Sequence, residues 1–555
     1  MTETIRIYCK NNRTYYDVPI GSSLLDIYQL VGSPLENRPL NAEVNNKVEG
    51  LNYRCWIPKD IEFNDYSTMS GYRCYVRSLC FILAKAVHDL YPDDTLNIEH
   101  PVSRGYYCIV RGDKKFTPDD IERVKTRMQE MIDEDKHFHQ KYDRTEAAIE
   151  LFKERNMPLK AQLLETAGIP YTIYHEMDGY VNFFYGCLTP STGYIHLFDL
   201  VPYFDGMLLR VPKRENPLEL EPIIRQDKMF EVFKSHLQLQ RTLGLENVGQ
   251  LNEAVNKKMT SDIIMVSEAL QEKQVAKIAE EIAGRYNDGV RIVLISGPSS
   301  SGKTTFCKRL NIQLVTNLLH PVGISLDNYF LNRSNTPKDE NGEYDFESLY
   351  ALDLDFFNQQ LKDLIDGKEI DAPSYDFETG NRIFKGNKMK LEGNSIIVIE
   401  GIHALNPELT AKIEDKLKYR VYVSVLTTIS LDNHNWIPTT DNRLLRRIIR
   451  DYKYRGYSAQ ETIHRWPSVR RGEDKWIFPY QENADAMFNS AMIYELATMR
   501  KFAEPILSAV KETDPENAEA YRLLRFLRYF NYIPDSSLPG TSLLREFLGS
   551  SYFHY

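Results

Sequence analysis

Polar and apolar residues alternate along the first part of the chain before helical spacing takes over. Residues 5–9 alternate, an Asn-Asn turn follows, and residues 14–18 continue the extended pattern, which predicts a hairpin. A Gly-Ser-Ser turn then precedes apolar positions at helical spacing over residues 24–28. A hairpin followed by a helix predicts a small β-grasp module, which we place at residues 1–65.

Residues 66–215 mix two helical patterns with a stretch typical of strands. Apolar positions over residues 78–91 follow helical spacing. A second helix is predicted to begin after Thr117 and to run through Ile132, because Thr is a good N-cap and the next residue is a proline, which suits a first turn. Residues 181–200 alternate between aromatic stretches and turns, which indicates strands. We therefore expect an α+β domain.

The pattern changes again near residue 290. Residues 216–288 are mostly helical and form a predicted connector. Over residues 289–500, short apolar runs alternate with helical stretches, as in an α/β domain whose parallel sheet is flanked by helices. The runs lie at residues 292–295, 322–326, 396–399 and 421–425. Residues 501–555 are predicted to be a helical tail.

Composition narrows the class of protein. The 555 residues include 68 Lys and Arg against 78 Asp and Glu, a net charge of −10 that argues against a general nucleic-acid binder. The seven cysteines are scattered and form no C-x-x-C pair. The sequence shows neither a secretory signal nor an apolar run of about 20 residues that would cross a membrane. We expect a reduced, cytoplasmic protein without a membrane partner.

The most specific motif is a Gly- and Ser-rich turn between an apolar run and a helical stretch. It fits the pattern G-x-x-x-x-G-K-[ST] through Gly297, Pro298, Ser299, Ser300, Ser301, Gly302, Lys303 and Thr304. Backbone N–H groups in such a turn, together with the positive end of the helix, suit phosphate oxygens. We expect Lys303 to reach the β- and γ-phosphates of a nucleotide and the Thr304 hydroxyl to bind Mg²⁺.

Two acids stand where apolar runs end. Asp327 directly follows residues 322–326, and Glu400 directly follows residues 396–399. Ligands of open α/β sheets bind outside the carboxyl ends of the strands. A kinase needs one group that orients or deprotonates the acceptor hydroxyl and one carboxylate for the hydrated metal. We assign Asp327 to the first role and Glu400 to the second; the alternative for each is a cap on the following turn.

Arginines are concentrated late in the α/β region. A helix would place four of them on one face, with a fifth just beyond: Arg443, Arg446, Arg447, Arg450 and Arg455. Their planar forks suit phosphoryl charge, and a solvated helix face is the alternative. The Trp-flanked residues 466–476 are predicted to be either part of a mobile lid or an exposed loop.

Taken in order, these motifs resemble the uridine kinase and phosphoribulokinase family over about residues 290–500. Residues 325–330, 344–353, 372–377 and 399–405 also match segments of that family. The resemblance implies an α/β P-loop fold, ATP and Mg²⁺ as cofactors, and a phosphotransferase that acts on an alcohol group.

The resemblance also assigns roles to residues. It implies that Lys303, Asp327, Arg446 and Arg450 are catalytic, and that Thr304 and Glu400 bind the metal. It implies that the phosphate loop as far as Thr305, with Arg455, binds ATP. The acceptor site that it implies consists of Glu347, Tyr375, Phe377 and Arg382.

One departure from the family bears on the acceptor. In pyrimidine nucleoside kinases a His shortly after the Tyr-Asp-Phe segment helps to read the base, and here Gly380 stands near that place. The leading expectation is transfer of the γ-phosphoryl group to a ribose 5′-hydroxyl, of uridine or cytidine type. The alternative is a sugar or sugar-phosphate kinase, for which Arg382 and Lys385 would supply cations.

The N-terminal half resembles other proteins. Residues 1–65 look like a TGS domain, and residues 66–215 are similar to the editing domain of threonyl-tRNA synthetase. That domain edits with an H-x-x-x-H pair and a later C-x-x-x-H. Here the positions hold Arg77 and Phe81, and then Cys187 and Ser191. We therefore expect no editing activity, and a binding or regulatory module for an RNA or a small molecule.

A hypothesis of another class makes the chain a nucleotide-switched RNA-binding or regulatory protein. Basic residues favour it mildly, while the acidic total opposes it; they are Lys10, Arg13, Lys47, Arg54, Arg73 and Arg77. The partner expected first is a small nucleoside or sugar phosphate, and a homo-oligomer stays open.

Overall fold

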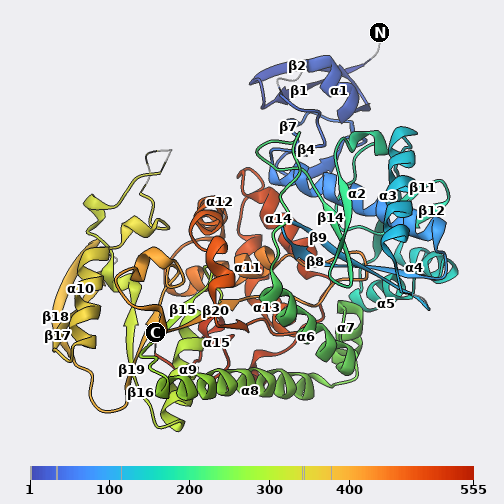
Figure 1. The fold of residues 1–555 in the computed structure, drawn as a ribbon. Helices are drawn as coiled ribbons and strands as arrows, with labels where there is room; N and C mark the ends of the chain where they lie inside the picture. Colours follow the sequence, from blue (N-terminus) through green and yellow to red (C-terminus); the bar gives the residue numbers. More distant parts are fainter. Residues whose placement is uncertain are drawn as a thin grey trace.

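The computed structural model of the chain describes residues 3–32, 35–113, 115–339, 342, 344–376 and 378–554. A small sheet module projects at the N-terminal end, helices and further sheets form the middle part, and a parallel sheet flanked by helices forms the C-terminal part (Figure 1). Buried apolar side chains of the middle and C-terminal parts belong to one continuous core.

The N-terminal module is a five-stranded sheet with one helix. Its strands are β1 (Thr4–Cys9), β2 (Thr14–Pro19), β4 (Asn41–Val44), β5 (Val48–Gly50) and β7 (Asp60–Asn64), and β3 (Ser22–Ser23) pairs separately with β6 (Arg54–Cys55). The order is β2-β1-β7-β4-β5, and only β1 and β7 are parallel. Helix α1 (Leu24–Val31) begins after Ser23, whose hydroxyl accepts a hydrogen bond from the N–H of Asp26. The hairpin and helix lie where we expected them; the β-grasp assignment stays a prediction.

Two like charges face each other in this sheet. Glu43 of β4 is paired directly with Glu62 of β7, and burial together with the Glu62 charge raises the pKa of Glu43 to about 7. A carboxyl with a raised pKa keeps its proton longer in the folded than in the unfolded protein. The stability that this carboxyl contributes is therefore lost as the pH rises from 4.5, its ordinary pKa, to about 7, its pKa in the folded protein.

The substitution Glu43→Gln is expected to remove this loss. We expect the variant to exceed the parent in free energy of unfolding by about 1–2 kcal/mol at pH 8, and to match it at pH 4. Thermal unfolding at both pH values measures the difference. The control Glu150→Gln, at an exposed position of α4 (Thr145–Glu154), is expected to change neither value. An equal gain at pH 4 and pH 8 would contradict the titration of Glu43.

The middle part combines a four-stranded sheet and a smaller three-stranded sheet with several helices. One sheet has the order β13-β14-β9-β8, and the other has the order β10-β11-β12. Besides α4, its elements are α2 (Met69–Leu90), β8 (Thr95–Val102), β9 (Gly105–Arg111), α3 (Pro118–Asp133), β10 (His139–Arg144), α5 (Pro158–Ala167), β11 (Tyr171–Met177), β12 (Tyr180–Asn182), β13 (Asp199–Tyr203) and β14 (Gly206–Arg210). The helix predicted after Thr117 is present as α3, with Thr117 as its N-cap.

Two predicted boundaries in this part are wrong. Helix α2 begins at Met69 rather than residue 78, because Thr68 caps it and the first turns carry Gly71 and polar residues that obscure the spacing. Residues 181–200 are mostly irregular, since β12 ends at Asn182 and β13 begins at Asp199. Their aromatic side chains enter the core directly instead of alternating across a pleated sheet; Phe183 is an example.

The connector is helical, as predicted. It consists of α6 (Asp227–Leu243), α7 (Val248–Asn256) and α8 (Thr260–Asn287), and α8 runs along the base of the molecule in Figure 1. Within the part of the chain that the structure describes, neither α8 nor any other helix has both the length and the apolar character that crossing a membrane requires.

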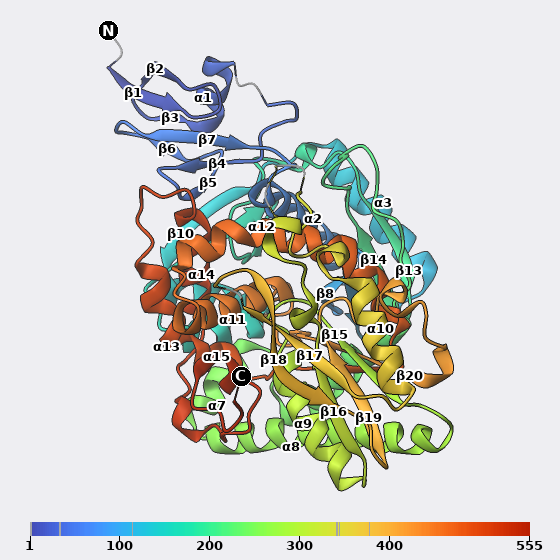
Figure 2. The ribbon, with the colours of Figure 1, turned by 90° about the vertical axis from the view of Figure 1, so that its left-hand side faces the viewer.

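The C-terminal part contains the expected parallel sheet. All neighbours in the order β16-β19-β15-β20-β21 are parallel, and helices cover it on both sides (Figure 2). The strands are β15 (Ile292–Ser296), β16 (His320–Ser325), β19 (Ser395–Glu400), β20 (Lys418–Ser424) and β21 (Ala486–Asn489), and β17 (Ile370–Asp376) forms a hairpin with β18 (Asn381–Met389). The helices are α9 (Lys303–Thr316), α10 (Leu354–Ile365), α11 (Thr439–Tyr454), α12 (Ala459–Trp476), α13 (Glu495–Ser508), α14 (Asn517–Leu527) and α15 (Arg545–Leu548). The α/β prediction is confirmed.

Of the two alternatives for residues 466–476, the exposed loop is wrong, because these residues form the second half of α12; their part in a mobile lid stays a prediction. The helix begins at a capping box of Ser458 and Glu461 and continues through Pro467. Close packing also explains the glycine at residue 472, because a side chain there would collide with Glu347. The Pro and Gly that suggested a loop are thus accommodated in a helix that packs closely against the candidate acceptor side.

A buried polar seam joins the middle part to the segment that leads into α11. Lys160 Nζ of α5 lies 2.9 Å from Asp432 Oδ1, and both side chains are inaccessible to solvent, at 1% and 0% exposure. Asn435 donates a hydrogen bond to the Phe183 carbonyl at 2.9 Å, and Asn433 donates one to the Leu96 carbonyl at 3.0 Å. The N-terminal half therefore holds in place the segment just before the arginine-bearing helix.

Candidate active site

The phosphate-loop motif lies at the carboxyl edge of the parallel sheet. Strand β15 leads into it and α9 begins at Lys303, so the N–H groups of the first helical turn are directed at the loop. The strands on one side of β15 are β19 and then β16, so Glu400 and Asp327 reach the same edge. This is the place where an open parallel sheet binds its ligand.

Four predicted residues come together there. Thr304 Oγ1 donates to Glu400 Oε2 at 3.4 Å, and Lys303 Nζ donates to the Pro298 carbonyl at 3.1 Å. Burial lowers the pKa of Lys303, while the charges of Glu400 and Asp327 oppose that shift. Burial raises the pKa of Asp327, and burial together with Asp327 raises the pKa of Glu400 to about 7. The charges of Lys303, Asp327 and Glu400 therefore act on one another at this edge of the sheet.

The donor chemistry at this edge fits a hard divalent cation. Thr304 and Glu400 offer a hydroxyl and a carboxylate, and desolvation together with the Asp327 charge raises the pKa of Glu400, whose ionised form a divalent cation would favour. Among the described residues, no group of three or more His, Cys, Asp and Glu side chains could enclose a metal. Mg²⁺ is usually held by one or two protein oxygens plus substrate phosphates, so this donor set is compatible with it.

The arginines of α11 do not form the solvated face given as the alternative. Arg443 and Arg446 are fully buried, and they pair with Glu473 and Glu495, respectively. Arg446 also donates to the Ser490 carbonyl at 3.0 Å. These two guanidinium groups therefore stabilise the fold next to the phosphate loop. The buried position of Arg446 differs from the open position expected of a lid arginine.

Other arginines of the same segment face the site. Arg447 donates to the Ser299 hydroxyl at 2.8 Å, and Arg450 pairs with Asp451 at 2.8 Å. The charges of Arg450 and Arg455 lower the pKa of Asp327, so both guanidinium groups lie near this candidate acceptor-orienting acid. The sequence analysis gave Arg447 no separate role and missed Glu473, which accepts from the Ser299 N–H at 3.0 Å. No local pattern distinguishes Glu473, because its role depends on where α12 packs.

The acceptor-side residues are placed unequally. Glu347 is half-buried near Glu473, and desolvation together with that charge raises the pKa of Glu347 to about 7. Tyr375 is buried on β17, with its ring 5.6 Å from that of Phe330. Arg382 of β18 is held by Asp353 at 3.0 Å and by the Phe330 carbonyl at 3.2 Å. Phe377 lies outside the described residues.

The backbone explains why no histidine stands at the place of Gly380. Gly380 has a φ of +70°, in the left-handed region that side chains rarely adopt, and it packs against the Arg333 side chain. A His here would be strained and would clash. Any side chain that recognises a base by hydrogen bonds must therefore come from another position.

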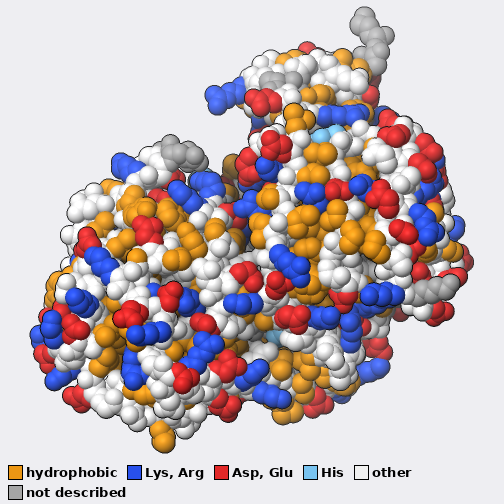
Figure 3. Space-filling view, in the orientation of Figure 1, with side chains coloured by type: hydrophobic (Ala, Val, Ile, Leu, Met, Phe, Trp, Pro, Cys, Tyr) orange, Lys and Arg blue, Asp and Glu red, His pale blue; other side chains and the backbone are white. Residues whose placement is uncertain are grey.

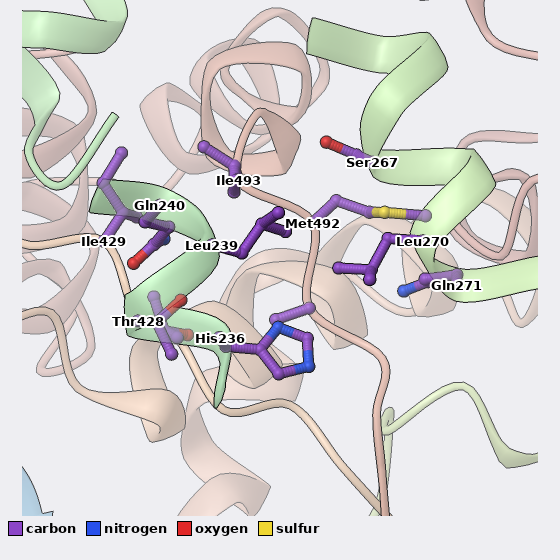
Figure 4. Close-up of a pocket in the computed structure, with 12 residues that line it drawn as sticks. His236, Leu239, Gln240, Ser267, Leu270, Gln271, Thr428, Ile429, Met492 and Ile493 are labelled. Atoms are coloured by element: carbon purple, nitrogen blue, oxygen red, sulfur yellow. The ribbon is translucent and has the colours of Figure 1, made fainter. Parts of the chain in front are cut away.

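A small cavity lined by none of the described candidate site residues is not the substrate pocket. It lies between α6, α8 and the segments that follow β20 and β21 (Figure 4) and has a volume of about 20 Å³. Gln240 lines it, and among the described residues its side-chain amide has no hydrogen-bond partner. A polar cavity of this size is large enough for one water molecule and far too small for a nucleoside.

The editing-like positions also have definite places. Arg77 Nε donates to the Cys187 carbonyl at 3.1 Å, Phe81 packs edge-on against Phe138 in the core, and Ser191 is buried. A hydrogen bond with Cys74, together with Arg77, lowers the pKa of Cys187 to about 6 despite its burial. Residues 77 and 81 are thus an arginine bound to a backbone carbonyl and a phenylalanine packed in the core.

Comparisons with known proteins single out the C-terminal part. A family model described as "Phosphoribulokinase / Uridine kinase family" matches residues 292–497. A uridine kinase of Staphylococcus aureus (strain JH9) is 30% identical over 196 residues, which cover 35% of this chain and 84% of that protein. A uridine kinase of Schizosaccharomyces pombe is 33% identical over 196 residues, which span only 37% of its length. A solved structure titled "Structure of a Possible Uridine Kinase from Bacillus stearothermophilus" is 18% identical, with a TM-score of 0.26, and the match covers 38% of this chain and 98% of that one.

Proposed function

The chain belongs to the phosphoribulokinase / uridine kinase family and is an ATP-dependent kinase, and on this premise we propose that it transfers the γ-phosphoryl group of ATP to the ribose 5′-hydroxyl of a nucleoside. Uridine and cytidine are the first candidates. The observation that carries the proposal is the joint placement of Lys303, Thr304, Asp327 and Glu400 at one edge of the parallel sheet.

In this proposal the phosphate loop binds and orients ATP. Backbone N–H groups of the loop and of the first turn of α9 donate to the phosphate oxygens, and the Lys303 ammonium neutralises the β- and γ-phosphates. Burial lowers the pKa of Lys303, and the negative charge of bound phosphate would oppose that shift. Arg450 and Arg455 stabilise the charge of the group in transit, and Arg446 supports the loop from behind.

Asp327 orients the acceptor hydroxyl and takes its proton. Its pKa is raised by desolvation, and the cations of Lys303, Arg455 and Arg450 oppose that rise. Thr304 and Glu400 would hold Mg²⁺, which would neutralise charge on the phosphates. Catalysis then rests on positioning and electrostatic stabilisation.

A nucleoside is favoured over a sugar phosphate by the state of Arg382. A phosphate acceptor would need free cations near β18, whereas this guanidinium is already neutralised by Asp353 and bound to a backbone carbonyl. The aromatic ring of Tyr375 suits a base, and the half-buried carboxylate of Glu347 suits a ribose. A sugar-phosphate acceptor remains the alternative that the experiment below separates.

The N-terminal half is proposed to be a binding or regulatory module, with a β-grasp unit of TGS type at its start. The Arg77 and Phe81 substitutions support a loss of editing chemistry, because neither side chain can activate water at that place. The face in Figure 3 shows basic and acidic side chains interspersed, which gives an RNA ligand no specific support. Seven unpaired cysteines support a reducing, cytoplasmic setting.

The test is ATP consumption with a panel of nucleosides and sugar phosphates, with Asp327→Asn beside the parent. We expect turnover that depends on a nucleoside, and a loss of about 100-fold or more in kcat for the variant with ATP binding retained. ATP consumption that depends on a sugar phosphate instead of a nucleoside would favour the sugar-phosphate alternative over the nucleoside proposal. Slow turnover that is indifferent to every acceptor and to Asp327→Asn would refute the proposed chemistry.

A further inference from the structure

A carboxylate of the chain itself already binds the phosphate-loop helix. Glu546, in α15, accepts a hydrogen bond from the Thr305 hydroxyl at 2.6 Å and another from the Thr305 N–H at 3.2 Å. These donors stand in the first turn of α9, directly after Lys303 and Thr304. N–H groups at such a helix start are the groups that a phosphate loop offers to nucleotide phosphates. The carboxylate therefore uses donors that a bound nucleotide would need.

The segment that carries Glu546 is anchored on both sides of the site. Leu543 packs directly on Gly302, in the space that a side chain at residue 302 would fill. Phe547 lies under the guanidinium of Arg446, 5.0 Å from ring centroid to Cζ, and the carbonyl of Leu548 accepts from Lys453 of α11. Leu543, Phe547 and Leu548 are all buried. The segment thus ties the phosphate loop to the arginine-bearing helix.

Glu546 itself differs from these anchors. It is half-buried, and among the described residues its carboxylate forms no ion pair within 4.0 Å. Its charge acts on both Lys303 and Glu400, which puts a further negative charge next to the proposed phosphate and metal positions. A phosphate group, which carries more negative charge, can displace a carboxylate that is held by two hydrogen bonds and by no cation.

We propose that Glu546 is a built-in competitor of ATP: its carboxylate occupies the Thr305 donors, and nucleotide binds only by displacing it. This inference rests on the proposed role of the phosphate loop in binding ATP. Its consequence is that the segment 542–549 sets the ATP affinity of the enzyme. The apolar anchors keep the segment docked, so the displacement needs only the Glu546 side chain to rotate away.

The test is the equilibrium affinity of the full chain for ATP and for ADP, by calorimetry, in the parent and in Glu546→Gln and Glu546→Ala. Glu546→Gln removes the charge at constant shape, and Glu546→Ala removes the hydrogen-bond acceptor too. We expect Kd to fall about tenfold in Glu546→Ala and by a smaller factor in Glu546→Gln, because a hydrogen bond to a charged group is lost from the free state. Glu504→Gln, the same change in α13, is expected to leave Kd unaltered.

The outcomes separate this inference from the proposed function. Unchanged or weaker binding of ATP in both Glu546 variants would overturn the competition, and weaker binding would make Glu546 a nucleotide ligand instead. Lys303→Met serves as the reference for the loop: if it weakens ATP binding while the Glu546 variants equal the parent, only the competition fails. If the parent and every variant bind no ATP, the proposed function fails with it.

Discussion

Lys303→Met is expected to lower kcat for phosphoryl transfer by about 1,000-fold. The lysine is the cation placed between the phosphate loop and the two strand-end acids, and its side chain is half-buried. A methionine fills a similar volume but leaves the transferring charge without a partner. The fold is expected to survive, because the pKa of Glu400 is already raised to about 7 and this carboxyl can take up a proton when the cation is lost.

Steady-state ATP consumption with the accepted nucleoside measures this effect, and thermal unfolding reports on the fold. Lys416→Met provides the matched control, since that side chain is exposed and far along the chain from the loop. The control should retain parental kcat. Parental turnover in Lys303→Met itself would mean that the phosphate loop does not carry the reaction.

Lys160→Met is expected to destabilise the protein by about 3–5 kcal/mol, because it breaks an ion pair that is buried on both sides. The change leaves Asp432 charged, buried and unpaired in the seam between the two halves. Asp432 also accepts from the backbone N–H groups of His434 and Asn435, so the loss should spread to the whole segment before α11. Chemical denaturation followed by fluorescence measures the free energy of unfolding.

A double variant distinguishes a lost ion pair from lost packing. Lys160→Met combined with Asp432→Asn removes both charges and keeps an acceptor for the two backbone N–H groups. We expect the double variant to lose clearly less stability than the sum of the single variants. Additive losses would show that the pair contributes no coupling. Lys153→Met, in the exposed ion pairs of α4, is the control and should cost less than about 1 kcal/mol.

The sequence predicted the site where the chemistry is local and failed where it depends on packing. The loop from Gly297 to Thr304 and the acids at strand ends were predictable, because strand, turn and helix follow one another directly and parallel strands end at one edge. The burial of Arg446 was not, because its partner Glu495 is 49 residues away and nothing local pairs them. Glu473 and Glu546 reach the loop from 174 and 241 residues away, respectively.

The same distinction explains the fold. The capped helices α1 and α3 were found because their caps are read from adjacent residues. The predictions of an exposed loop at residues 466–476 and of strands at residues 181–200 were wrong, because the Pro, Gly and aromatic residues there are placed by tertiary packing and not by turns or strands. Gly472 against Glu347 and Phe183 in the continuous core are the clearest cases.

The shared core of the two halves has a consequence for the order of synthesis. Tyr185 bonds the carbonyl of Arg522, 337 residues later in the chain, and Asn252 bonds the carbonyl of Tyr529 at 2.7 Å. A ribosome that adds about 5–20 residues per second delivers these partners roughly 20–70 s after the first half has emerged. During that interval the apolar surface meant for α14 is uncovered on the nascent chain. The growing polypeptide is therefore expected to engage chaperones until its last helices arrive, and fast translation should raise the yield of folded protein.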